Sequence, residues 1–115
     1  MFIPSAEKYL EYYTKDYGER DLNKILHAVS NDKRFNNLIA FSLQNKVLPT
    51  PNDFIECVMN KITWSFAKKT KIIAAAIILL LRWDAEVNQK YGLASSSTLE
   101  GFTLSIIESG NQMGM

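Results

Sequence analysis

Ten apolar residues follow one another without a break from Ile72 to Leu81, inside the segment KKTKIIAAAIILLLRWD. A bilayer core is about 30 Å thick and needs about 20 mostly apolar residues in a helix. The run supplies half of that length, and extending it in either direction draws lysines or Arg82 into hydrocarbon, which is costly. A segment that is apolar on every side is typical of a helix surrounded by other helices. We therefore predict a central core helix and no membrane span.

The segment before residue 20 has the pattern of a surrounding helix. Its apolar residues recur at steps of three and four from Ala6 to Tyr17, which gives a helical stripe. Ser5 is placed as the N-cap, and Gly18 as the left-handed residue that ends the helix. Further stripes predict a short helix from Arg20 or Asp21 and a third one capped by Asn31 or Asp32.

Turn and capping motifs mark the later boundaries. Thr50-Pro51-Asn52-Asp53 predicts a helix start, with threonine as the cap and proline at the first helical position. The other motifs are a left-handed glycine after the central helix, a capping box and a terminal glycine: Gly92, Ser97–Glu100 and Gly110. Two alternatives exist for the fourth and fifth helices. Either a break separates them and Thr70 caps the fifth, or they form one long bent helix. The break is favoured, because a rod of about forty residues is rare in a compact domain.

Together these elements predict an all-α fold. We expect a single compact domain of five or six helices packed around a central hydrophobic helix at about residues 70–91. The length of 115 residues suits one domain, and 47% hydrophobic with 22% charged residues is ordinary for a globular protein. The helical domain is expected over residues 1–109, with 110–115 as a flexible tail.

Residues that commonly carry chemistry are scarce. One cysteine, Cys57, excludes an intrachain disulfide, and with one histidine, His27, no zinc site of Cys and His is plausible. Cys57 is expected to be a small core residue. We interpret three acidic pairs as solvated helix faces and caps rather than as metal ligands: Glu7/Glu11, Glu19/Asp21 and Asp84/Glu86. We expect no cofactor, no metal and no enzyme activity, and the lack of an export signal makes a cytoplasmic location the default.

Arg20 and His27 suggest a remote enzymatic alternative. Small all-α RNases of the HEPN superfamily carry an R-x(4–6)-H pair on a helix, often with a polar residue after the arginine. The stretch Arg20-Asp-Leu-Asn-Lys-Ile-Leu-His27 is similar to that pair, with Asp21 as the polar residue. The similarity covers two residues, and the pair lies early in this chain but late in that superfamily. It implies a small RNase that uses Arg20 and His27.

A lysine cluster suggests a second function. The formal net charge of +1 gives no overall electrostatic case for nucleic acid, so any such case rests on local clustering. The sequence has one local concentration of positive charge, which consists of Lys61, Lys68, Lys69 and Lys71. Trp64 lies among these lysines in the sequence. Lysines beside an exposed aromatic ring bind single-stranded nucleic acid through phosphate attraction and base stacking. The alternative is that they solvate the end of a very apolar helix.

Four tyrosines near the N-terminus suggest the function that we favour, which is binding to another protein. Tyr9, Tyr12, Tyr13 and Tyr17 cannot all point inward from one helix, so at least one ring is expected at the surface. Exposed tyrosines are favoured in protein interfaces, because they combine apolar area with a polar tip. The sequence therefore favours a non-enzymatic helical protein–protein interaction module or a small subunit of a larger assembly. Self-association is a further expectation, since six helices are few for covering a central one.

Overall fold

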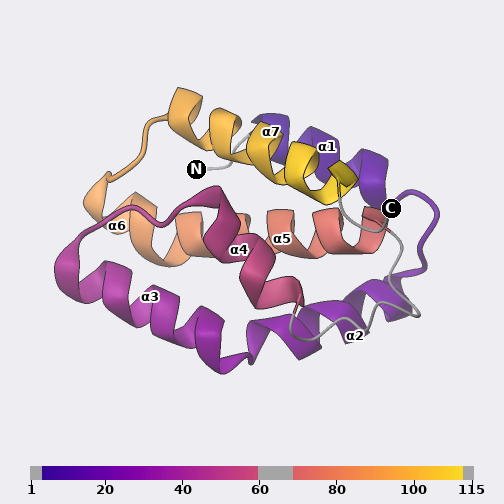
Figure 1. Ribbon diagram of the computed structural model, residues 1–115, viewed down its shortest axis with the longest axis horizontal. Coiled ribbons are helices and arrows are strands. Elements are labelled where there is room, and N and C mark those ends of the chain that lie inside the picture. The colour runs from indigo at the N-terminus through magenta and orange to yellow at the C-terminus, as the bar shows by residue number, and fades with distance from the viewer. Residues whose placement is uncertain (1–3, 60–68, 113–115) are drawn as a thin grey trace.

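The computed structural model describes residues 4–59 and 69–112, and every regular element in these ranges is helical (Figure 1). In chain order the elements are α1 Pro4–Thr14, α2 Glu19–Ser30, α3 Lys33–Asn45, α4 Pro51–Met59, α5 Lys69–Trp83, the π-helical turn η1 Asp84–Asn88, α6 Gln89–Tyr91 and α7 Ser96–Gln112. Because α5, η1 and α6 follow without a gap, they form one continuous helix over residues 69–91. The described residues thus form six helices, and the predicted all-α fold is confirmed.

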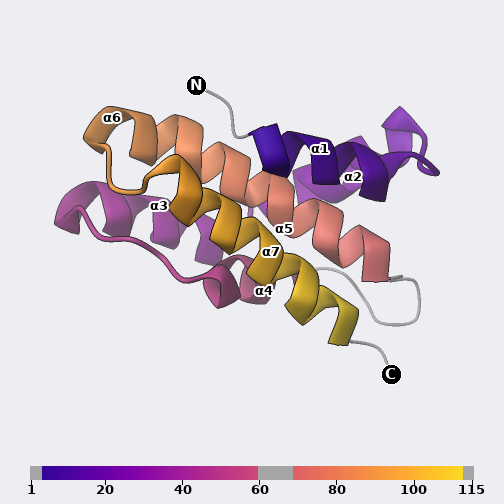
Figure 2. The same ribbon diagram turned by 90° about the horizontal axis from the view of Figure 1, so that it is seen from above.

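Helix α5 lies at the centre, and the other helices surround it. In Figure 1 it crosses the middle of the view, with α7 on one side, α2 and α3 on the other, and α4 across its front. Seen from above, α1 and α7 lie on either side of it (Figure 2). Its most extensive contacts are with α1, α4 and α7. The radius of gyration is 13.2 Å, which is the size expected of a compact domain of this length.

The apolar run of α5 is buried by these neighbours. The buried residues of this helix are Ile72, Ile73, Ala74, Ala75, Ala76, Ile77, Leu79, Leu80 and Trp83, while Ile78 and Leu81 are half-buried. Burying one Leu- or Ile-sized side chain contributes roughly 1.5 to 3 kcal/mol, so the run is a major source of folding free energy. The predicted central helix is therefore confirmed. In the described ranges, no helix has both the length and the apolar character to cross a membrane.

Three predicted helix boundaries are confirmed by local hydrogen bonds or backbone angles. The backbone N–H of Arg34 donates to Oδ1 of Asp32 at 2.7 Å, so Asp32 caps α3. Thr50 and Asp53 cap α4 reciprocally: the Thr50 N–H donates to Asp53 Oδ2 at 2.7 Å, and the Asp53 N–H donates to Thr50 Oγ1 at 3.3 Å. Gly92 follows α6 with a φ of 61°, the left-handed conformation that ends a helix.

Other predicted boundaries are wrong. Helix α1 includes Ser5 and ends at Thr14, and Gly18 is an extended residue with φ −70° that precedes α2. Helix α7 begins at Ser96, before the predicted capping box Ser97–Glu100. Its start is stabilised by Ser95 instead, whose hydroxyl accepts the Thr98 N–H at 3.2 Å. At both boundaries, several neighbouring small polar residues or glycines could cap or end the helix. The sequence alone does not show which of them does so.

The predicted end of the last helix at Gly110 is also wrong, because α7 continues to Gln112. Gly110 is buried against α5. A Cβ atom on Gly110 would overlap Cγ1 of Ile73 and lie 2.9 Å from its Cδ1. The glycine therefore lets two helices approach closely rather than ending one of them. Residues 113–115, which belong to the predicted tail, lie outside the described residues.

Helices α4 and α5 pack against each other, so they are not parts of one straight rod. The connection itself lies in residues 60–68, outside the described residues. Thr70 is the second residue of α5 rather than its cap, and its hydroxyl forms a hydrogen bond with the Tyr17 hydroxyl.

Candidate functional site

The tyrosines of the N-terminal segment divide into two outward and two inward rings. On α1, Ala6 is fully buried and Tyr13 packs against the core. Tyr9 and Tyr12, on the same helix, are 36% and 61% exposed. Tyr17, in the turn after α1, is half-buried and hydrogen-bonded to Thr70 of α5. The structure thus places two of the four predicted contact residues at the surface.

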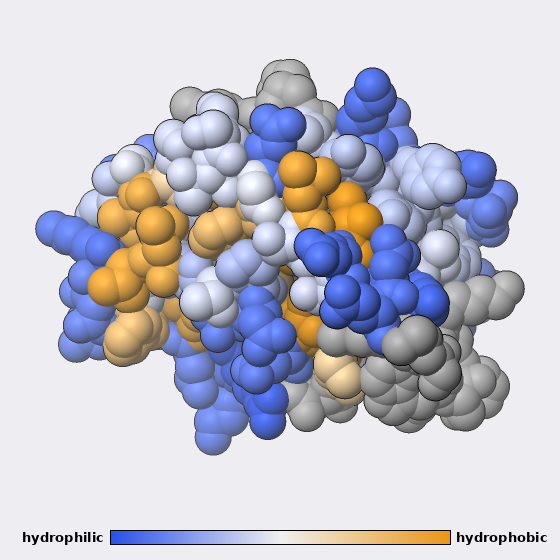
Figure 3. Space-filling view, turned by 45° about the horizontal axis from the view of Figure 1, so that its top comes forward, coloured by the Kyte–Doolittle hydropathy of each residue, from blue (hydrophilic) through white to orange (hydrophobic). Residues whose placement is uncertain are grey.

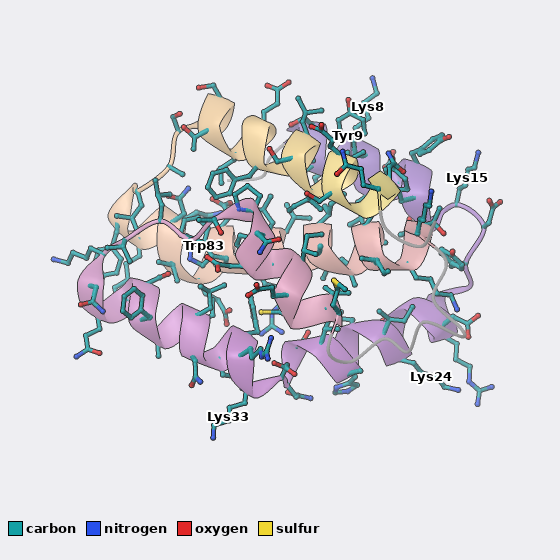
Figure 4. All side chains as sticks on the ribbon, in the orientation of Figure 1. Lys8, Tyr9, Lys15, Lys24, Lys33 and Trp83 are labelled. Atoms are coloured by element: carbon teal, nitrogen blue, oxygen red, sulfur yellow. The ribbon has the colours of Figure 1, made fainter. Side chains whose placement is uncertain are left out.

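The exposed rings border a depression of about 460 Å³. We call it the tyrosine face; its described lining consists of Ser5, Lys8, Tyr9, Tyr12, Tyr13 and Glu100. Helix α1 supplies all of these except Glu100, which comes from α7. Figure 4 shows Lys8 and Tyr9 projecting together from α1 near α7. Sequence reasoning missed Glu100, because only the packing of α1 beside α7 brings it to the tyrosines.

Neighbouring side chains hold the ring of Tyr12 in place. It meets the Tyr13 ring edge-to-face, with centroids 5.1 Å apart and an interplanar angle of 88°. The Lys15 ammonium lies 4.8 Å from the Tyr12 centroid. Edge-to-face ring pairs contribute about 0.5–1.5 kcal/mol and exposed cation–π contacts about 0.5–1 kcal/mol. The most exposed tyrosine is therefore partly ordered before any partner arrives.

The predicted lysine cluster is only partly described. Lys61, Trp64 and Lys68 lie outside the described residues, so their proximity stays a prediction. Lys69 and Lys71 begin α5, and both are half-buried. The ammonium of Lys71 lies 5.5 Å from the Tyr17 ring centroid, which gives this lysine an internal contact.

Arg20 and His27 share one surface depression on α2. This depression, of about 560 Å³, is lined by Arg20, Asn23, Lys24 and His27, and all four side chains are exposed. Nδ1 of His27 lies 3.3 Å from the side-chain nitrogen of Asn31, one turn further along the helix. The structure thus brings the two predicted residues together among basic and amide side chains.

A groove between α3 and α4 contains the cysteine. It has a volume of about 740 Å³, and its described lining includes Phe41, Cys57, Asp53 and Glu56. Phe41 is 56% exposed, whereas Cys57 is buried, as predicted. Burial, followed by the negative charges of Asp32 and Asp53, raises the pKa of Cys57 to about 11. The side chain is therefore a neutral thiol near pH 7 and a poor nucleophile.

Apolar side chains also reach the surface at the end of the molecule where α6 lies. Figure 3 shows them gathered there, at the left of the view, with a second group near the middle. Val47 and Leu48, in the connection between α3 and α4, are 38% and 44% exposed, and Leu104 on α7 is 46% exposed. Apolar atoms contribute more than half of a typical protein surface, so these exposed residues do not by themselves indicate a binding site.

The π-helical turn η1 holds a buried polar network. The prediction that Asp84 lies on a solvated face is wrong: its side chain is buried, while Glu86 is exposed. The Asn88 amide nitrogen donates to Asp84 Oδ1 at 2.8 Å and to the Ala94 carbonyl at 3.1 Å, and the Ala94 N–H donates to Asn88 Oδ1 at 2.6 Å. Asn88 therefore ties the start of the α6–α7 connection to the central helix. Its hydrogen bonds are internal, which indicates a structural role.

Next to this turn, Trp83 is fully buried (Figure 4). Its indole N–H donates to the Ser42 hydroxyl at 3.1 Å, which joins the central helix to α3.

Among the described residues, no three His, Cys, Asp or Glu side chains gather as metal ligands would. In comparisons with known proteins, the chain matches no family model, no curated protein and no solved structure.

Proposed function

We propose that the protein is a non-enzymatic interaction module that binds a protein partner through the tyrosine face. One observation carries the proposal: Tyr9 and Tyr12 stand outward at 36% and 61% exposure and border a depression that extends from α1 to Glu100 of α7. Aromatic anchors beside a pocket are the residues that dominate binding energy in protein interfaces.

The arrangement favours binding because part of its entropic cost is already met. An interface loses about 0.5–1.5 kcal/mol for each flexible side chain that it immobilises. Tyr12 is already restrained by Tyr13 and Lys15, so ordering it costs less. Two tyrosines of this kind bury large apolar area while their hydroxyl groups stay available for hydrogen bonds.

The rim of the tyrosine face adds charges of both signs. Lys8 and Glu100 line the same depression from two helices and carry opposite charges. A rim of this kind suits a partner with mixed charges and sets orientation and association rate more than affinity. A protein surface offers such a mixture, whereas a nucleic-acid backbone offers negative charge alone.

The proposal is tested by affinity capture from a lysate of the native host, with and without nuclease treatment. The bait is the full chain, compared with the double variant Tyr9→Ser/Tyr12→Ser. Phe41→Ser is the matched control, because it removes a similarly exposed aromatic ring from a different helix. We expect the same partner with the wild type and Phe41→Ser, independent of nuclease, and its loss with the double variant.

Two results would contradict the proposal. Retention of the partner by the double variant would exclude the tyrosine face, and loss of the partner on nuclease treatment would favour nucleic-acid binding instead. Sedimentation of the purified chain over a range of concentrations tests the remaining case, in which the partner is a second copy. Self-association through this face would disappear in Tyr9→Ser/Tyr12→Ser.

A further inference from the structure

Helix α2 carries a row of hydrogen-bond donors along one side. Arg20, Asn23, Lys24 and His27 follow one another at the steps of three and four that place residues on one helix face. All four side chains are exposed and line one depression. We call this surface, with the depression next to it, the α2 face.

The neighbouring depression, of about 480 Å³, shares Asn23 and His27 and continues toward the end of α2 and onto α5. It adds Asn31 and Arg82, and Arg82 is a residue that the sequence pattern of α2 cannot reveal. The guanidinium of Arg82 lies 5.4 Å from the Phe35 ring centroid and 3.6 Å from a carboxylate oxygen of Glu86. These contacts hold the guanidinium at the edge of the depression, while its side chain keeps 38% exposure.

The side chains that line the α2 face carry mainly positive charge, and Glu86 pairs with Arg82 at its edge. Its described lining combines basic side chains with amide and hydroxyl groups and the half-buried Leu26, and contains no carboxylate. The whole chain has a net charge of only +1, so this bias is local rather than a consequence of composition. A local cationic surface attracts an anionic ligand and raises its association rate.

We infer that the α2 face binds the phosphate backbone of double-stranded nucleic acid. A helix rises about 1.5 Å per residue, so the row from Arg20 to Asn31 is about 16 Å long, which is more than a single phosphate needs. Arginine, lysine and asparagine side chains are the groups that commonly contact phosphate and sugar. This inference does not depend on the tyrosine face, which lies on α1 and α7.

The chemistry of the face favours this ligand over other polyanions. A single-strand site needs aromatic rings on which bases stack, and the described lining contains none. An anionic membrane surface is bound by helices that also insert large apolar side chains, and the only apolar side chain in the described lining is Leu26, which is half-buried. The face therefore suits backbone contacts without base recognition.

The expected affinity is low and strongly dependent on salt. Three permanent charges, Arg20, Lys24 and Arg82, predict a slope of log K against log salt of about −2.7, from about −0.9 for each neutralised phosphate. Removing Arg20 and Lys24 leaves a slope of about −0.9.

Fluorescence anisotropy of a labelled, mixed-sequence DNA duplex tests the inference, with the full chain titrated at several salt concentrations. Arg20→Ala/Lys24→Ala is expected to weaken binding at least tenfold at low salt and to flatten the slope as stated. The matched control is Lys46→Ala/Lys90→Ala, which removes two charges that lie over the Tyr91 ring, one directly after α3 and one on α6. The control is expected to keep most of the affinity.

A second pair of variants tests the same face with a single charge. Asn23→Asp places a carboxylate where both depressions meet, and it is expected to weaken binding more than Asn36→Asp, at an exposed position on α3. Thermal melts establish that these surface variants remain folded. No duplex binding at low salt, equal losses in test and control variants, or binding to anionic lipid vesicles but not to the duplex would each overturn the inference.

Discussion

Two glycines in α7 are predicted to respond in opposite directions to the same substitution. Gly101 is exposed, and a Cβ atom there would meet nothing within 4 Å. Replacing a helical glycine by alanine at such a position stabilises by about 0.5–1 kcal/mol. At Gly110 the new methyl group would collide with Ile73, which is fully buried. Overpacking costs about 1–3 kcal/mol, and a clash with two atoms of a buried side chain belongs in the upper half of that range, about 2–3 kcal/mol. Subtracting about 1 kcal/mol for the gain in helix propensity leaves a net loss of about 1–2 kcal/mol.

Thermal and urea unfolding followed by circular dichroism measures both effects. A change of about 1 kcal/mol shifts Tm by about 4 °C in a domain of this size. We therefore expect Gly101→Ala to raise Tm by about 2–4 °C and Gly110→Ala to lower it by about 4–8 °C. Ile73→Ala provides the critical background, because it removes the colliding atoms. If Gly110→Ala were equally destabilising with Ile73 and with alanine at position 73, the proposed close approach of α5 and α7 would be refuted.

Further predictions concern the core, the cysteine and the buried network. Ile77→Asp places an unpaired charge in the centre of α5 and should abolish cooperative unfolding; a melt that stays cooperative with a small shift would contradict this. Cys57 should react with a maleimide at pH 7 only slowly unless denaturant is added. Because its pKa is raised from 9.0 to about 11, the unfolded chain ionises first, so wild-type stability should fall more steeply than that of Cys57→Ala as the pH rises from 9 to 11. Asn88→Ala should lower the free energy of unfolding, measured by urea denaturation, by about 2–3 kcal/mol. The substitution removes the amide group that bonds to Asp84 and Ala94.

The parts of the fold that follow from adjacent residues could be predicted from the sequence. Thr50 and Asp53 cap α4 through bonds between neighbours, and Gly92 ends α6 because left-handed backbone favours glycine. The burial of α5 followed from its composition alone. The role of Gly110 depends on Ile73, a residue far away in the chain, so the local sequence wrongly predicts a helix end there.

The candidate sites show the same division between local and distant contacts. The spacing of Tyr9, Tyr12 and Tyr13 on one helix predicts that at least one ring is exposed, but it does not show which ones. Glu100 belongs to the tyrosine face because α7 packs beside α1, and Arg82 belongs to the α2 face because α5 packs beside α2. The spacing of residues on α1 or α2 indicates neither of them. The buried position of Asp84 was unpredictable for a similar reason, because its hydrogen-bond partners depend on the π-helical turn.

Native-state hydrogen exchange of α5 tests most directly whether the apolar run is enclosed by its neighbours, so that only outer faces remain for binding. The amides of Ile73, Ile77 and Leu80 lie in its fully buried part. We expect them to exchange only through global unfolding, with free energies equal to that from urea denaturation. Exchange through local openings at free energies several kcal/mol lower, while α1 and α7 stayed protected, would contradict the account.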